Sequence, residues 1–142
     1  MRDPSRSARG HLGGDPGRCL KQVSDELGHA MGSRLLIDAA DAIRSAIRQC
    51  DVPARVGGDE FAVLLVGGRT AAENVVGRLN DVIARTNSAS CGPYTLSLSV
   101  GTAVSSHGDR HSLSRLLSEA DDEMYANKRA RRSDRSGSSP GR

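Results

Sequence analysis

Apolar residues recur at helical spacing in several stretches of the chain. The clearest stretch spans residues 33–49, where they stand at Leu36, Ala39, Ala40, Ile43 and Ile47. This spacing predicts a helix with one face in the core and with Ser33 as its N-cap. The helix should end before Pro53, because the residue before a proline is pushed out of the helical region. The same spacing predicts helices over residues 19–29, over residues 70–85 and from about Ser112 onward.

Two other stretches have patterns that are typical of strands. Apolar and polar residues alternate over residues 94–104, which predicts a half-buried strand. Residues 55–66 predict a hairpin that enters at Arg55 and Val56, turns at two glycines and leaves through an apolar run from Phe61 to Val66.

Neither end of the chain has such a pattern. Residues 1–18 are rich in Arg, Gly, Ser and Pro, which predicts a disordered segment. Within it, residues 9–18 contain four glycines and one leucine, and we expect no buried strand from that composition. Residues 133–142 predict a disordered basic tail. The folded domain is therefore expected to span residues 19–132.

The order of the predicted elements is helix, helix, hairpin, helix, strand and helix. This order predicts an α/β (α+β) domain of the ferredoxin-like type, an antiparallel sheet flanked by helices, with its first central strand missing. A chain of 142 residues is long enough to bury a single core.

The net charge of +3 comes from the two ends of the chain, residues 1–18 and 128–142, whereas residues 19–127 between them are mildly acidic. This distribution argues against nucleic-acid binding. The three cysteines have neither disulfide nor zinc-site spacing. No apolar run is long enough for a membrane span or a signal peptide, so we expect a cytoplasmic protein.

The predicted hairpin carries the most informative chemistry. Gly57 and Gly58 at its tip give the backbone access to positive φ and let a large ligand approach closely. Asp59 and Glu60 follow directly, and because strand side chains alternate between faces, they need not share one role. Two carboxylates beside a glycine turn suit Mg²⁺ and a nucleotide triphosphate. The alternative is a surface hairpin with a solvated acid pair.

Several spaced segments together resemble one known family. The run Gly57-Gly58-Asp59-Glu60-Phe61 is letter for letter the signature of the GGDEF domain, the diguanylate cyclase family. LKQVSD and GHAMG, at residues 20–25 and 28–32, resemble its FKxxND and GHxxGD segments. RQCD at residues 48–51 resembles its RxxD inhibitory site, SVG at residues 99–101 its SxG, and ADDEMYANK at residues 120–128 its ADxAMYxAK. The chain is identified as a member of this family over roughly residues 19–132.

The resemblance implies a palm-type nucleotidyl cyclase fold and the condensation of two GTP into cyclic di-GMP by a homodimer. It implies two Mg²⁺ ions per site, held by Asp59 and Glu60, with Glu60 also able to help deprotonate the attacking 3′-hydroxyl. The remaining implied contacts are Gly57 and Gly58 against the nucleotide and Lys128 and Arg132 on its phosphates. For the two basic residues, a solvated tail is the alternative.

Departures from the family pattern gather in the same implied site. Ser24 and Ser33 stand where the family has the Asn and the Asp that hydrogen-bond guanine. Serine is shorter and cannot offer the two-acceptor face that guanine requires. The strand that should carry a metal-binding aspartate is replaced by the glycine-rich residues 9–18. Asp15 either stands in for that ligand or is a turn residue before Pro16.

Arg48 and Asp51 match the inhibitory site that binds cyclic di-GMP in this family. An arginine can bind a guanine edge or a phosphate through two hydrogen bonds, and a nearby carboxylate can accept the guanine donors. The alternative is a surface ion pair at a helix end.

Three hypotheses follow for the function. The first is a diguanylate cyclase, weak or inactive because of these departures. The second is a catalytically degenerate module that binds cyclic di-GMP or GTP and regulates through that binding. The third is that the sequence begins downstream of the natural start of the protein.

Overall fold

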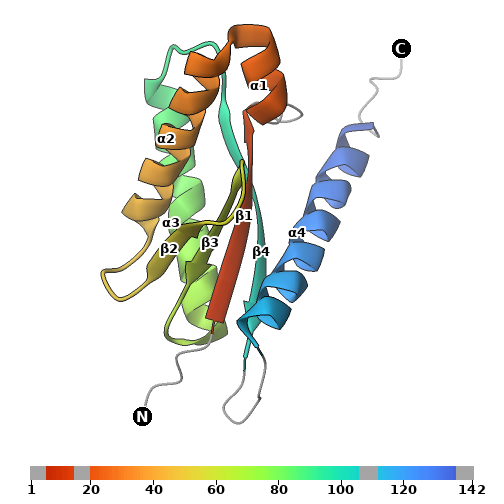
Figure 1. Ribbon diagram of the computed structural model, residues 1–142. Coiled ribbons are helices and arrows are strands. Elements are labelled where there is room, and N and C mark those ends of the chain that lie inside the picture. Colours follow the sequence, from red (N-terminus) through yellow and green to blue (C-terminus); the bar gives the residue numbers. More distant parts are fainter. Residues whose placement is uncertain (1–5, 15–19, 106–111, 137–142) are drawn as a thin grey trace.

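The computed structural model describes residues 6–14, 20–105 and 112–136 (Figure 1). Its elements, in chain order, are β1 (Arg6–Gly14), α1 (Leu20–Leu27), α2 (His29–Ala46), β2 (Val52–Arg55), β3 (Glu60–Leu64), α3 (Gly68–Ala89), β4 (Leu96–Val104) and α4 (Leu113–Ser136). None of the helices within the described ranges is long and apolar enough to cross a bilayer.

The four strands form one antiparallel sheet in the order β2-β3-β1-β4. Helices α2 and α3 lie together on one side of the sheet, and α4 lies alone on the other (Figure 1). The predicted ferredoxin-like fold, with an antiparallel sheet flanked by helices, is confirmed.

The first central strand, predicted to be missing, is present. Strand β1 pairs with β3 on one side and with β4 on the other, in a register that sets His11 opposite Glu60 and Arg9 opposite Gly101. The prediction treated side-chain composition as decisive, but strand pairing is made by main-chain groups that glycine also carries. Residues 6–14 are therefore ordered, whereas Asp15 and Pro16 lie outside the described residues.

The apolar side chains that the sequence analysis expected from a central strand come instead from the neighbouring strands. Phe61, Val63 and Leu65 project from the β3 segment into the same buried cluster as Leu96 and Leu98 of β4. The other members of this cluster come from the helices and are Val23, Leu35, Ala39, Ala42, Ile43, Ala46, Ala72, Val75 and Leu79. By alternation, Glu60 and Ala62 lie on the opposite face of the sheet, the face toward α4.

Several predicted helix boundaries are wrong. Helix α2 begins at His29, so Ser33 is not its N-cap, because Gly28 at φ 91 separates α1 from α2. It ends at Ala46, and Pro53 lies in edge strand β2, where a missing N–H is tolerated. Helix α3 extends beyond residues 70–85 at both ends, and residues 133–136 continue α4 instead of starting a disordered tail.

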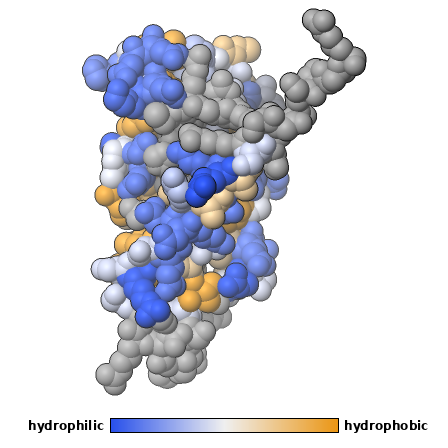
Figure 2. Space-filling view, turned by 90° about the vertical axis from the view of Figure 1, so that its right-hand side faces the viewer, coloured by the Kyte–Doolittle hydropathy of each residue, from blue (hydrophilic) through white to orange (hydrophobic). Residues whose placement is uncertain are grey.

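Helix α4 packs on β4 at Gly101, the glycine of the SVG segment. A Cβ atom there would overlap the Ala120 carbonyl oxygen and the Met124 backbone nitrogen and would lie 2.8 Å from the Met124 Cβ. Ala103, Leu116 and Ala120 form a small buried cluster at the same contact. The absence of a side chain at residue 101 is thus what lets the helix backbone touch the sheet. Hydrophilic residues prevail on the outer surface of this side (Figure 2).

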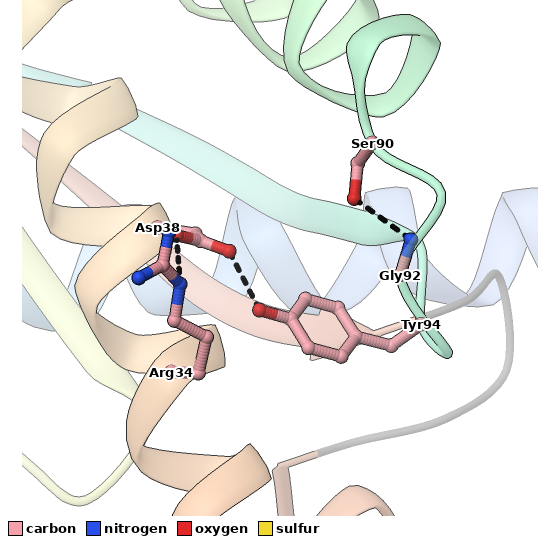
Figure 3. Close-up of polar contacts among 5 residues, drawn as sticks. All are labelled: Arg34, Asp38, Ser90, Gly92 and Tyr94. Carbon is pink, nitrogen blue, oxygen red and sulfur yellow. Dashed lines mark hydrogen bonds and ion pairs between the residues drawn. The ribbon is translucent and has the colours of Figure 1, made fainter.

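A polar cluster ties α2 to the segment before β4 (Figure 3). The Tyr94 hydroxyl donates to Asp38 Oδ2 at 2.6 Å, and Arg34 Nε lies 3.0 Å from Asp38 Oδ1. Burial of the ring, followed by the hydrogen bond to Asp38, raises the pKa of Tyr94 to about 12. Asn87, at the end of α3, bonds both the N–H and the carbonyl of Leu96 at 2.8 Å, which fixes where β4 begins.

Replacing Gly101 with Ala should destabilise the protein by about 3 kcal/mol, because the added methyl group has no space between β4 and α4. Gly77→Ala is the matched control. Gly77 lies in α3 with open space around its Cβ position, so alanine should stabilise the helix by about 0.5–1 kcal/mol. Urea unfolding of both variants measures the difference, and equal midpoints would contradict the tight contact at Gly101.

Tyr94 should ionise near pH 12 in a Tyr125→Phe protein, in which it is the only tyrosine. Because the folded state raises this pKa, the contribution of Tyr94 to stability is complete below about pH 10 and is lost as the pH rises through about 12. Ultraviolet absorbance of the tyrosinate follows the titration. Adding Asp38→Asn should lower the midpoint. A midpoint near pH 10 without that change would refute the cluster.

Candidate functional site

The tip of the β2–β3 hairpin is fixed by its own backbone and by Arg55. The N–H groups of Val56 and Gly57 both donate to the Glu60 carbonyl, at 2.9 and 3.3 Å. The Arg55 guanidinium donates to the carbonyls of Gly57 and Gly58, at 3.2 and 2.9 Å. The sequence analysis assigned no role to Arg55. Its position directly before the glycine turn could have indicated that its side chain binds the turn.

Neither of the two tip glycines has a positive φ, and only Gly57 is needed for the space that it leaves. The described glycines with positive φ are Gly28, Gly67 and Gly68, so the predicted use of positive φ at Gly57 and Gly58 is wrong. A Cβ atom on Gly57 would lie 3.0 Å from Glu60 Oε2, since the Glu60 side chain folds over it. Gly58 has no such neighbour within 4 Å. The tip therefore presents bare backbone at Gly58 next to a carboxylate.

Asp59 and Glu60 are both partly exposed and follow one another from the turn into β3. Carboxylates of this kind suit Mg²⁺, which takes one or two of them together with substrate phosphates. Within the described ranges, no group of three His, Cys, Asp or Glu side chains is placed to hold a metal ion. The described residues therefore suit a metal ion that takes its remaining oxygen ligands from a nucleotide. They do not suit a metal ion that is held by protein side chains alone.

Lys128 lies on α4, level with the start of β3. The side chain of the preceding residue, Asn127, donates to the Val100 carbonyl at 3.1 Å. Val100 is opposite Gly10, and Gly10 is opposite Phe61, so this part of α4 lies over the row of residues that leads across the sheet to the start of β3. Strand β3 is two strands, or about 10 Å, from β4 within the sheet. Arg132 is on the same helix, but its side chain lies outside the part that the structure describes.

Ser24 and Ser33 do not form a joint polar pair. The Ser24 hydroxyl fills the space over Gly32, so that a Cβ atom on Gly32 would overlap Ser24 Oγ. This contact joins α1 to α2. Ser33 is exposed, in the first half of α2. The structure thus gives Ser24 a role in helix packing and leaves Ser33 in solvent.

Arg48 and Asp51 form a tight turn between α2 and β2. Asp51 is 7% exposed, and its Oδ2 accepts from the Arg48 N–H at 2.8 Å, while the Asp51 N–H donates to the Arg48 carbonyl at 3.0 Å. No ion pair joins the Arg48 guanidinium to Asp51 among the described residues, so the surface ion pair considered above is not formed. Asp51 holds the turn, and the Arg48 side chain is exposed.

Arg78 of α3 braces the same turn and was missed from the sequence. Its Nε donates to the Ala46 carbonyl at the end of α2, at 2.7 Å. Its Nη2 is a buried side-chain atom without a hydrogen-bond partner in the described part of the chain. An arginine between the apolar residues Val75 and Leu79 could have indicated a partly buried charge. Its partner could not be identified from the sequence, because it is 32 residues away.

Comparison with known proteins places these observations in a family. The family model described as "Diguanylate cyclase, GGDEF domain" matches residues 17–134. Diguanylate cyclase TpbB of Pseudomonas aeruginosa is 37% identical over 123 residues, covering 82% of this chain and 27% of that protein. The chain thus spans about a quarter of the length of this relative.

Solved structures agree in fold. An EAL/GGDEF domain protein from M. capsulatus superposes with a TM-score of 0.72 at 34% identity, over 92% of this chain and 83% of that one. A microbial GGDEF domain, described in its interaction with cyclic di-GMP, gives a TM-score of 0.65 at 25% identity, over 88% and 74%. The signature at the hairpin, the order of the strands and the family match lead to one conclusion: this chain belongs to the GGDEF-domain diguanylate cyclase family of cyclic di-GMP signalling.

Proposed function

We propose that this chain binds GTP at the β2–β3 hairpin in the manner of its family, but weakly, and makes little or no cyclic di-GMP as it stands. The observation that carries the proposal is the place of Ser24. Its short hydroxyl is used against Gly32 in the contact between α1 and α2. A serine hydroxyl packed in this way is also too short to offer the two-acceptor face that a guanine base requires.

The residues that would hold GTP are at one end of the sheet. Gly58 offers bare backbone for close approach of the triphosphate, and Gly57 leaves space that Glu60 fills. Lys128 and Arg132 would neutralise phosphate charge from α4. Asp59 and Glu60 would hold Mg²⁺, which when bound supplies charge stabilisation to the transferring phosphoryl group. Glu60 would also accept the proton of the attacking 3′-hydroxyl.

Low activity follows from what these residues lack. Weak base recognition loosens substrate binding by about 1–3 kcal/mol for each hydrogen bond left unmade. The pair of carboxylates supplies fewer ligands than two Mg²⁺ ions need. Each domain would contribute one GTP, so any activity requires two copies that face one another. We place the chain in the cytoplasm, where GTP and cyclic di-GMP are found.

A second candidate function is favoured by the turn between α2 and β2. The buried Asp51 and the brace from Arg78 hold this turn in one conformation, and the Arg48 side chain is left exposed beside it. A fixed backbone with an exposed arginine lowers the entropy cost of binding a guanine edge or a phosphate. The chain would then be a regulatory module that binds cyclic di-GMP.

Purified protein with GTP and Mg²⁺ should give little or no cyclic di-GMP by nucleotide chromatography. Ser24→Asn with Ser33→Asp should tighten GTP binding by roughly tenfold or more and still give no turnover, because base contacts act equally in ground and transition states. Ser33→Ala is the control, which removes a hydroxyl and adds no base contact. Sustained turnover by the unaltered chain would overturn the proposal. Turnover by the double variant alone would show that the metal site is already complete.

Arg48→Ala should weaken cyclic di-GMP binding by about one to two decades, the effect of losing a charge-assisted contact of about 1.5–3 kcal/mol. The matched control is Arg44→Ala, which removes an exposed arginine four residues earlier, on α2. Calorimetry compares the three proteins. Equal affinities for the unaltered chain and Arg48→Ala would eliminate the regulatory-module candidate.

A further inference from the structure

The two outer strands of the sheet differ in how their free edges are protected. Strand β2 is four residues long and contains Pro53 and Arg55, and shortness, proline and charge all disfavour the addition of another strand. Strand β4 is nine residues long, and its sequence LSLSVGTAV contains neither a charged residue nor a proline. By its own sequence, β4 is thus an open template for strand pairing.

Helix α4 supplies the protection that β4 lacks. Glu123 accepts hydrogen bonds from the Thr102 backbone N–H and from the Thr102 hydroxyl, the latter at 2.8 Å. One turn later, Asn127 donates to the Val100 carbonyl at 3.1 Å. Val100 and Thr102 are two residues apart, so their main-chain groups point to the same side of the strand, away from β1. Two side chains of α4 therefore satisfy main-chain groups that another strand would otherwise bind.

We propose that Glu123 and Asn127 act as an edge guard, which closes β4 against pairing with the β4 strand of a second copy of this chain. The guard is separate from the packing of α4, which rests on Gly101 and on the Leu116 and Ala120 cluster. Both guard residues stand where the ADxAMYxAK segment has alanine. The role is independent of nucleotide binding.

The main-chain groups that the guard covers would fit the β4 strand of a second copy of this chain. Without the guard, each copy leaves the Thr102 N–H and the Val100 carbonyl unpaired in the middle of an uncharged strand. In an antiparallel arrangement about a two-fold axis, each β4 supplies the acceptor and the donor that the other lacks. Because β4 carries no charge, this pairing meets no electrostatic repulsion.

Amide exchange at Thr102 tests the guard directly. Glu123→Ala should speed exchange of this amide by roughly tenfold, the effect of losing one hydrogen bond of about 1.4 kcal/mol. Glu123→Gln keeps an acceptor and should restore protection. Glu119→Ala is the control, since it removes the same charge from α4, and the polar partner of Glu119 among the described residues is Arg115 and not β4. Unchanged exchange in Glu123→Ala, measured by NMR, would refute the guard.

Sedimentation velocity tests whether a second copy of this chain pairs with the unguarded β4. Glu123→Ala with Asn127→Ala should show a concentration-dependent association that the unaltered chain and Glu119→Ala lack. Adding Thr102→Pro should abolish it, because proline removes the outward N–H without touching the bonds to β1. If the double variant shows no added association, or if the association survives Thr102→Pro, pairing through β4 is wrong. Should the double variant fail to fold, the exchange results for the single variants decide the proposal.

Discussion

The main-chain pairing of β1 with both of its neighbours is the interaction on which the rest of this structure depends. One side of β1 sets the register of β3, and with it the position of the hairpin that carries Asp59 and Glu60. The other side sets the register of β4, which holds Gly101 under α4. Removal of β1 would separate the sheet into a hairpin and a single strand. The hairpin would then lose its fixed relation to Lys128.

The two candidate binding sites are turns next to the sheet at which backbone groups and charged side chains are exposed. At the hairpin, Arg55 holds two tip carbonyls and Glu60 lies over Gly57, so the acids start from a fixed turn. At the turn between α2 and β2, the Asp51 carboxylate is used by the backbone, which leaves Arg48 as the group available to a ligand. We propose a nucleotide triphosphate as the ligand of the first site and a guanine edge or a phosphate as the ligand of the second.

The sequence allowed the fold type and the hairpin to be predicted, because both depend on local patterns. Apolar spacing placed the body of α2, although the helix begins at His29 and not after Ser33, and two glycines before two acids marked the tip. Strand β1 could not be predicted from composition, since its pairing uses main-chain groups that every residue carries. The Arg78 contact with Ala46 and the Glu123 contact with Thr102 join residues far apart in sequence, so only the assembled fold reveals them. The beginning of α2 was missed because Gly28, and not Ser33, breaks the helix.

The most direct test of this account is amide hydrogen exchange across residues 6–14, measured by NMR on the whole chain. If β1 pairs on both sides, its amides should be protected about as strongly as those of β3, since both are central strands of one sheet. Exchange at the rate of an unstructured segment, with β3 and β4 still protected, would contradict the account. It would show that the sheet forms without a central strand from this part of the chain.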